Sequence, residues 1–236
     1  MPTGVALRDA RAQLFAAAER VLARDGVSGL TSRAVTDDAG VAKGVLHRHF
    51  TDFDDFLAEL IRDRITVLGQ EASDLENKVG VDSVISNLTA ALTLIFTPTA
   101  LGLIALISSR DAVRARLRET TPRGVPIFTE ASAMLSCYLR AERDLGRLLP
   151  DADADALAFT LIGTGHLLFT GELGGLPDME AVDEIVKSII VGAQPRHPPL
   201  IDSSAAGLQV VASATAITTS VGITASRQPS PPPSPR

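Results

Sequence analysis

Apolar side chains recur at a helical spacing through most of this chain. From residue 7 to residue 191 they fall three or four positions apart, and no convincing strand-like alternation occurs before residue 200. This spacing gives each helix one apolar stripe, which must be buried against other helices. Because 45% of the 236 residues are apolar, the chain is large enough to form that core. The sequence therefore predicts an all-α fold.

Caps and turn residues divide the pattern into separate helices. Thr31 and Asp52 are suitable N-caps, and Gly26 and Gly40 suit the left-handed conformation that ends a helix. The predicted helices are residues 7–25, 32–39, 42–49, 53 to at least 68, 81–96, 99–107, 109–119, 125–148, 151–173 and 177–191. The fourth helix is too long for the small N-terminal unit, so we expect it to connect this unit to the rest.

Residues 195–236 differ in composition from the rest of the chain. They are rich in Pro, Ser, Ala and Thr and contain few charged side chains. Such segments do not bury enough apolar surface to offset the entropy lost on ordering. We therefore expect a disordered tail.

Several functional classes have little support in the sequence. Cys137 is the only cysteine, which rules out an internal disulfide and fits a reducing compartment. No secretory signal is apparent, so we expect a cytoplasmic protein. The uncharged run at 83–109 is long enough to span a membrane, but Pro98 divides it into two ordinary helices, and we expect no membrane contact. Phosphate-binding glycine loops and metal-binding spacings are missing, so we expect neither an enzyme nor a cofactor or metal.

The N-terminal region carries a local excess of basic residues. The whole chain has a formal charge of −6, whereas residues 1–50 contain seven Lys and Arg against five Asp and Glu. A nucleic-acid site depends on local positive charge rather than on the charge of the whole chain. Two short helices, at 32–39 and 42–49, are joined by a turn at Gly40 behind a longer helix. This is the spacing of a helix-turn-helix that binds double-stranded DNA.

The second short helix divides into a buried and an exposed face. Leu46 and Phe50 are four residues apart and are expected to pack inward. The exposed face would then consist of Lys43, Gly44, Val45, His47, Arg48 and His49. These are the predicted DNA-contacting residues of the helix.

The chemistry of this face suits a DNA groove. Lys43 can donate hydrogen bonds to guanine or to phosphate, Gly44 permits close approach, and Val45 can pack on a thymine methyl group. His47 and His49 can donate to phosphate or to bases, and they add charge only when protonated.

Thr31, Ser32 and Arg33 complete the predicted set at the start of the preceding helix. Hydroxyls and amides of Thr31 and Ser32 can meet phosphate, and Arg33 can reach a base edge or the backbone. Each residue taken alone is most simply a solvated surface residue. Their joint placement favours DNA binding.

The segment at residues 30–60 reads LTSRAVTDDAGVAKGVLHRHFTDFDDFLAEL. It resembles the N-terminal DNA-binding region of the TetR family of bacterial transcriptional regulators, and the resemblance covers about residues 7–70. The resemblance implies a helix-turn-helix domain at 1–52 and a helical effector-binding and dimerisation domain at 53–194, followed by the tail at 195–236. It also implies a regulator, commonly a repressor, that binds a palindromic operator as a homodimer and is released by a small-molecule effector.

Two departures from the family pattern concern DNA binding. The family usually has Ser where this chain has Ala42, so the recognition helix lacks a side-chain N-cap. A lysine that often anchors the fourth helix on phosphate is replaced by Phe53, and its acidic neighbours Asp52, Asp54 and Asp55 would repel phosphate. We therefore expect few phosphate contacts. The alternative is a helical interaction or ligand-binding protein in which DNA binding is weakened or lost.

The resemblance also places an effector pocket among the helices between residues 81 and 169. Its candidate lining residues are Phe96, Leu103, Ile107, Phe128, Met134, Cys137, Tyr138, Phe159, His166 and Phe169. Their composition indicates an apolar effector, although most such residues ordinarily belong to a core. The last two helices would pair in the dimer, where Gly163 and Gly165 permit close approach. An intramolecular core accounts for the same features.

Overall fold

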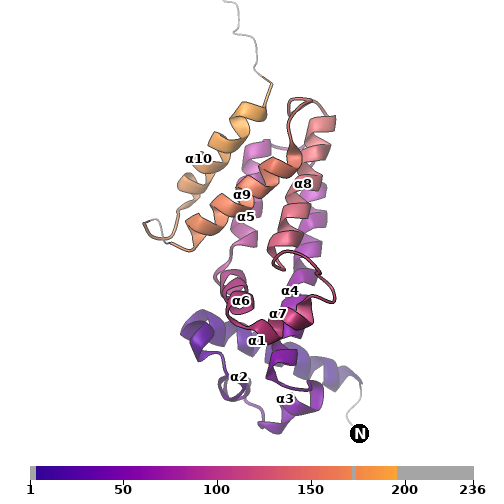
Figure 1. The fold of residues 1–236 in the computed structure, drawn as a ribbon, viewed down its shortest axis with the longest axis vertical. Coiled ribbons are helices and arrows are strands. Elements are labelled where there is room, and N and C mark those ends of the chain that lie inside the picture. Colours follow the sequence, from indigo (N-terminus) through magenta and orange to yellow (C-terminus); the bar gives the residue numbers. More distant parts are fainter. Residues whose placement is uncertain (1–3, 172–173, 196–236) are drawn as a thin grey trace, which may run out of the picture. The chain divides into compact units, whose positions relative to one another are not determined.

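The computed structural model of the chain describes residues 4–171 and 174–195, and this part is helical throughout (Figure 1). Its elements are α1 (Gly4–Gly29), α2 (Ser32–Asp38), α3 (Gly44–His49), α4 (Phe53–Glu76), α5 (Val84–Ile95), α6 (Pro98–Ser109), α7 (Asp111–Leu117), α8 (Phe128–Asp144), α9 (Ala154–Phe169), α10 (Met179–Ile190) and a 3-10 turn at Val191–Ala193. The all-α prediction is confirmed. The tail predicted at 195–236 lies, beyond Pro195, outside the described residues.

The predicted helix boundaries lie within four residues of those in the structure. Several helices start two or three residues later than predicted, and two end four residues earlier, each just before a glycine. The predicted helix at 125–148 is α8, which ends at Asp144 before Gly146 takes a positive φ of 74°. The predicted helix at 151–173 is α9, which ends at Phe169 before Gly171 takes a φ of 73°. Both corrections have one cause, because a glycine in the left-handed conformation stops a right-handed helix. In α1, Gly26 (φ 68°) likewise interrupts the regular helix as predicted.

Helices α1, α2 and α3 (Gly4–His49), which we call the reading head, pack around phenylalanine rings and two residues predicted to point inward. Leu46 is 0% exposed and Phe50 is 3% exposed, so both predicted anchors are buried. The ring of Phe50 lies 5.0 Å from that of Phe56 and 5.9 Å from that of Phe15. Phe56 belongs to α4, so this aromatic cluster fixes the reading head to the helix that follows it.

Helix α4 links the reading head to the other helices, as its length predicted. Its 24 residues span about 36 Å. It packs against α5, α7 and α8, and its buried stripe includes Leu57, Leu60, Ile61 and Leu68. Helix α1 also contacts α6, where a side chain at Gly102 would meet Leu22 at 2.7 Å. The reading head is therefore joined to the remaining helices along two seams.

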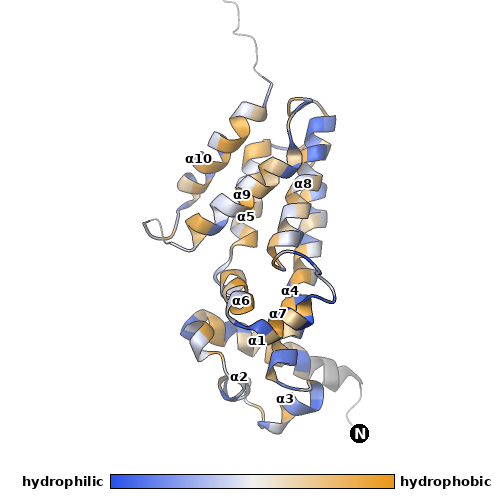
Figure 2. Ribbon diagram, in the orientation of Figure 1, coloured by the Kyte–Doolittle hydropathy of each residue, from blue (hydrophilic) through white to orange (hydrophobic). Residues whose placement is uncertain are grey.

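The uncharged run at 83–109 forms two helices rather than one. Thr97 caps α6 by accepting a hydrogen bond from the backbone N–H of Ala100, and Pro98 occupies the first turn. Figure 2 shows hydrophobic colouring along both α5 and α6. No single helix in the described ranges is long and apolar enough to cross a membrane, and α5 and α6 meet that test only as a pair bent by 59°.

A buried polar network ties α5 to α8. The side-chain amide of Asn87 donates to the hydroxyl of Tyr138 (3.0 Å) and to the carbonyl of Val81 (2.8 Å). Glu142 is 0% exposed; it accepts from the backbone N–H of Gly80 (3.2 Å) and pairs with Arg147 (3.3 Å). Burial, followed by the hydrogen bond with Glu142, raises the pKa of the Tyr138 hydroxyl above its ordinary value. Tyr138 is therefore an internal residue of this helical core.

Candidate functional site

The turn between α2 and α3 has the geometry of a helix-turn-helix. Thr31 caps α2 by accepting a hydrogen bond from the backbone N–H of Ala34 at 3.1 Å. The chain then reverses at Gly40, whose φ is 66°, a conformation that glycine adopts without strain. The N–H of Val41 donates back to the carbonyl of Thr36 at 3.0 Å. The turn is thereby fixed by backbone hydrogen bonds, and α3 leaves it in a set direction.

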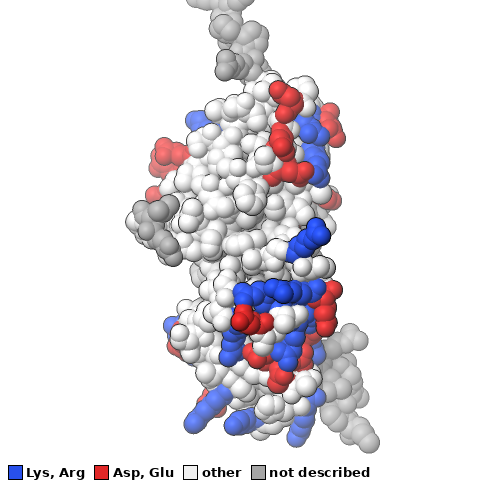
Figure 3. Space-filling view, in the orientation of Figure 1, with Lys and Arg blue, Asp and Glu red and all other residues white. Residues whose placement is uncertain are grey.

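Helix α3 presents most of its predicted face to solvent. Lys43, Gly44, His47 and Arg48 are exposed. Val45 and His49 are half-buried, because Val45 packs against the core and the His49 ring lies 6.4 Å from that of Phe50. Figure 3 shows basic side chains projecting at the end of the structure formed by α2 and α3.

The three predicted residues around the start of α2 are at least partly accessible. Thr31 is exposed, and 87% of the Arg33 side chain is accessible, although its guanidinium lies 3.5 Å from Asp37. Ser32 is half-buried, and its hydroxyl has no hydrogen-bond partner within the described ranges. The nine predicted DNA-contacting residues thus lie on α3 with its N-cap and around the start of α2, and these two helices contact each other.

The start of α3 lacks a side-chain cap. The helix begins after Lys43, whose side chain accepts no hydrogen bond from it, and it has only six residues. The side chain of Ala42 has no oxygen to cap the helix. Only its backbone carbonyl takes part, by accepting a hydrogen bond from the N–H of Val45 at 2.8 Å. An uncapped helix this short depends on the packing of Leu46 for its stability.

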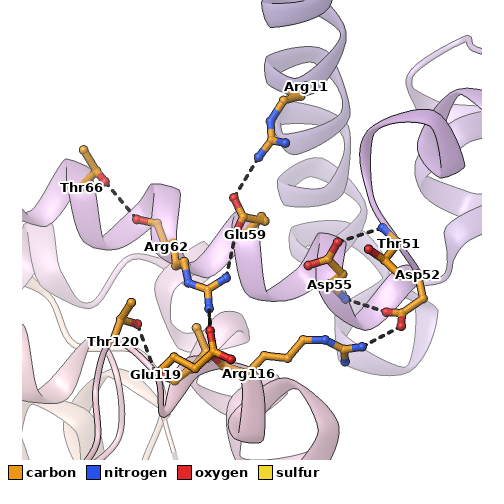
Figure 4. Close-up of polar contacts among 11 residues, drawn as sticks. Arg11, Thr51, Asp52, Asp55, Glu59, Arg62, Thr66, Arg116, Glu119 and Thr120 are labelled. Carbon is orange, nitrogen blue, oxygen red and sulfur yellow. Dashed lines mark hydrogen bonds and ion pairs between the residues drawn. The ribbon is translucent and has the colours of Figure 1, made fainter.

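Arginines from the α7 segment cover the acids at the start of α4, and this pairing was not foreseen from the sequence. Asp52 accepts a hydrogen bond from Arg116 at 2.6 Å, and Arg110 lies 3.1 Å from Asp54 (Figure 4 shows the first pair). Asp55 instead accepts from the backbone N–H of Thr51 at 2.8 Å. The partners of Asp52 and Asp54 lie more than 50 residues away in sequence, so no local pattern could have identified them.

A second set of ion pairs lies beside the first (Figure 4). Glu59 of α4 accepts from Arg11 of α1 at 2.9 Å and from Arg62 at 2.8 Å. Arg62 also donates to the backbone carbonyl of Arg116 at 2.8 Å. The Arg11 guanidinium lies 4.6 Å from the centre of the Phe50 ring. These contacts connect α1, α4 and α7 around the base of the recognition helix.

A cavity of about 620 Å³ lies between α8 and α9. It is lined by Gly124, Val125, Phe128, Thr129, Ser132, Ala133, Ser136, Cys137, Arg140, Asp155, Phe159, Ile162, Gly163 and His166. Small residues form much of this wall, and a volume of this order holds a drug-sized molecule. Among the described residues, no group of three or more His, Cys, Asp or Glu side chains is placed to hold a metal ion.

Polar groups occur at both ends of the cavity. Asp155 accepts hydrogen bonds from the Ser136 hydroxyl and from Arg140, and these bonds, in that order, lower its pKa below the usual range. The His166 ring stands edge-on to Phe128, with 4.9 Å between the ring centres. Its Nδ1 is buried and accepts or donates no hydrogen bond within the described ranges.

The candidate effector residues divide between this cavity and the core. Phe128, Cys137, Phe159 and His166 line the cavity. The others do not line it: Phe96, Leu103, Ile107, Met134 and Tyr138 are buried, and Phe169 stacks on Phe96 with 5.6 Å between ring centres. The small residues of the wall are not among the candidates, because large apolar side chains are the sequence signal of a ligand pocket.

Large apolar side chains are exposed on and beside α9 and α10. Phe159 is 76% exposed and Leu176 is 79% exposed, and Leu167, Met179 and Val191 are each about half exposed. Exposed apolar patches commonly mark interaction surfaces. Phe159 also belongs to the cavity wall, so the cavity opens beside this surface.

Comparison with known proteins identifies the reading head. Residues 14–60 match the profile of bacterial regulatory proteins of the tetR family, a stretch that runs from α1 into α4. No curated protein matches the chain.

Solved structures share the fold at low sequence identity. NemR of Escherichia coli in its reduced form is 18% identical (TM-score 0.63), with 80% of this chain and 100% of that chain covered. A TetR-family transcriptional regulator from Agrobacterium tumefaciens is 16% identical (TM-score 0.62; 80% and 99% covered). A protein from Saccharomonospora viridis in complex with choline is 19% identical (TM-score 0.60; 80% and 100% covered). The chain therefore combines the fold of these solved structures with an N-terminal segment that matches the tetR family profile.

Proposed function

We propose that the chain is a cytoplasmic transcriptional repressor, not an enzyme, that binds a palindromic operator as a homodimer and is released by a small, largely apolar effector. The observation that carries this proposal is the exposed face of α3, where Lys43, His47 and Arg48 stand clear of the core while Leu46 holds the helix in place. A helix anchored on one face and polar on the other suits the major groove.

Specific roles follow from chemistry and position. Lys43 donates to guanine or phosphate, and Gly44 lets the helix approach the bases. Arg33 and the amides near Thr31 meet the backbone, where contacts fix register rather than read sequence. Val45 and His49 are half-buried, so we assign them a smaller share of the contact.

The exposed apolar surface on α9 and α10 supports the dimer. A palindromic operator offers two identical half-sites, which a twofold-symmetric dimer reads together. Burying Phe159, Leu167 and Met179 against a second copy would remove the largest exposed apolar groups of these helices from water. Sedimentation at micromolar concentration tests this directly, and a chain that stays monomeric with and without operator would contradict it.

The cavity between α8 and α9 supports the effector. Phe128, Phe159 and Ile162 give it apolar walls, and its volume suits a small molecule. The relative from Saccharomonospora viridis in complex with choline supports a small-molecule ligand on this fold, although its cationic ligand does not define the one bound here.

DNA selection followed by binding measurements tests the main proposal. The operator is recovered from a random pool, and the dissociation constant is then measured against salt for the wild type, Lys43→Ala and the control Lys78→Ala, which removes an exposed lysine from the loop after α4. If Lys43 contacts phosphate, its loss reduces the slope of log K against log salt by about 0.9 per chain, and the control leaves it unchanged. Failure to recover any specific, salt-sensitive complex would favour the alternative of a helical ligand-binding protein without DNA binding.

A further inference from the structure

The carboxylates of Asp52 and Asp54 lie close to the DNA-reading surface. Asp52 follows the last residue of α3, His49, by three positions, so their Cα atoms are at most about 11 Å apart. That distance is close to the screening length of about 8–10 Å at physiological salt. An uncovered carboxylate there would repel a phosphate backbone that flanks the recognition helix.

Both carboxylates are covered by arginines that belong to the α7 segment. Arg116 reaches Asp52 at 2.6 Å, and Arg110 reaches Asp54 at 3.1 Å. The Arg110 guanidinium also lies 5.7 Å from the centre of the ring of Phe53, the residue between the two acids in sequence. The charge next to the recognition helix is therefore set by residues of the effector-binding part of the chain.

The two arginines are held in place rather than free on the surface. Val113 and Leu117 of α7 are 0% exposed, and α7 packs along α4. Arg62 of α4 donates to the carbonyl of Arg116 itself, which fixes the backbone that carries this guanidinium. The side chains remain partly accessible, with 34% of Arg116 and 48% of Asp52 exposed.

We propose that Arg116 and Arg110 are positioning residues for DNA reading, which act by neutralising Asp52 and Asp54 beside the recognition helix. This inference rests on the proposed DNA-binding function. Because partly exposed ion pairs contribute little to folding, the pairs matter chiefly through the charge that DNA meets. Movement of α7, which precedes the cavity-lining residues Gly124 and Val125, would uncover the acids and weaken DNA binding.

The test compares four forms of the full chain on the selected operator: wild type, Arg116→Ala, Asp52→Asn and the double variant. Arg116→Ala uncovers Asp52, so we expect operator affinity to fall roughly two- to tenfold at low salt, and less at high salt. Asp52→Asn keeps the N-cap of α4, since Asn caps helices as well as Asp does. The double variant should therefore recover wild-type affinity, and Arg116→Lys should retain most of it.

Arg114→Ala is the matched control, because it removes the same charge from α7 but uncovers Asp111 rather than an acid of α4. We expect it to leave operator affinity within twofold, and urea unfolding should show similar midpoints for all variants. Unchanged affinity in Arg116→Ala would overturn the inference while leaving the proposed function intact. The inference would also be overturned if adding Asp52→Asn to Arg116→Ala did not restore operator affinity, since Arg116 would then contact DNA itself or support the fold. A wild-type chain that binds no operator would overturn both proposals.

Discussion

Gly163 and Gly165 lie two residues apart in α9 but face different surroundings. A Cβ at Gly165 would meet the Phe96 ring at 2.5 Å and 3.1 Å and Leu92 at 3.4 Å, whereas a Cβ at Gly163 would meet nothing within 4 Å. Phe96 is 1% exposed and is stacked on Phe169, so its ring has little room to move. Gly165 thus allows close packing inside one chain, and Gly163 lines the cavity.

Replacing each glycine by alanine separates the effect of this contact from helix propensity. Both substitutions gain about 1 kcal/mol because alanine favours the helix, and Gly165→Ala also incurs an overpacking cost of about 1–3 kcal/mol. The gain cancels in the difference between the variants, which leaves Gly165→Ala about 1–3 kcal/mol less stable than Gly163→Ala. For a chain of this size, that corresponds to roughly 2–12 °C in Tm.

The assay is urea unfolding and thermal melting followed by circular dichroism. Each variant is measured at two protein concentrations, because dimerisation makes apparent stability depend on concentration. If the two variants unfold at the same midpoint, the close contact of Gly165 with Phe96 is not what limits this position. If Gly163→Ala is less stable than the wild type only at the higher protein concentration, then Gly163 lies in the dimer interface.

Three further predictions concern charge, the cavity and the buried network. Hydrogen bonds from Arg24 and then Arg20 lower the pKa of Asp38. Its ionised form therefore stabilises the fold above the unfolded pKa of about 3.9, and this stabilisation is lost as pH falls through the lower native pKa. Asp38→Asn should flatten that part of the curve of urea stability against pH, and an unchanged curve would contradict the assignment. Ala133→Phe should fill the cavity and abolish the thermal shift caused by a screened ligand without loss of operator affinity, and a retained shift would place the ligand elsewhere. Tyr138→Phe should cost about 1–2 kcal/mol in urea unfolding, whereas a neutral result would show that its hydroxyl is dispensable.

The reading head could be predicted from the sequence because its determinants are local. Gly40 must adopt a positive φ, and Leu46 and Phe50 lie one helical turn apart. Thr31 caps α2 by accepting a hydrogen bond from the backbone N–H of Ala34, three residues further along. Each of these constraints acts within a few positions, so spacing alone reveals them. The Asp52 pair with Arg116 spans 64 residues and depends on how α7 packs on α4, which no local pattern encodes.

The cavity illustrates a different limit. Large residues such as Phe96 and Tyr138 are among the predicted lining residues, but in the structure they are buried in the core. A hollow forms where side chains are small, as at Ser132, Ala133 and Gly163. Sequence reasoning identifies residues that occupy volume more readily than positions where volume is left free.

The side chain of Tyr138, whose buried hydroxyl joins α8 to α5, also determines the intrinsic fluorescence of the chain. Tyr138 is the only tyrosine, and the chain contains no tryptophan, so its near-ultraviolet emission arises chiefly from one residue that is 0% exposed. The reading head contains no tyrosine and therefore contributes no tyrosine signal. Fluorescence from the unlabelled protein would therefore report repacking around α5 and α8, and it would do so without interference from residues that approach DNA.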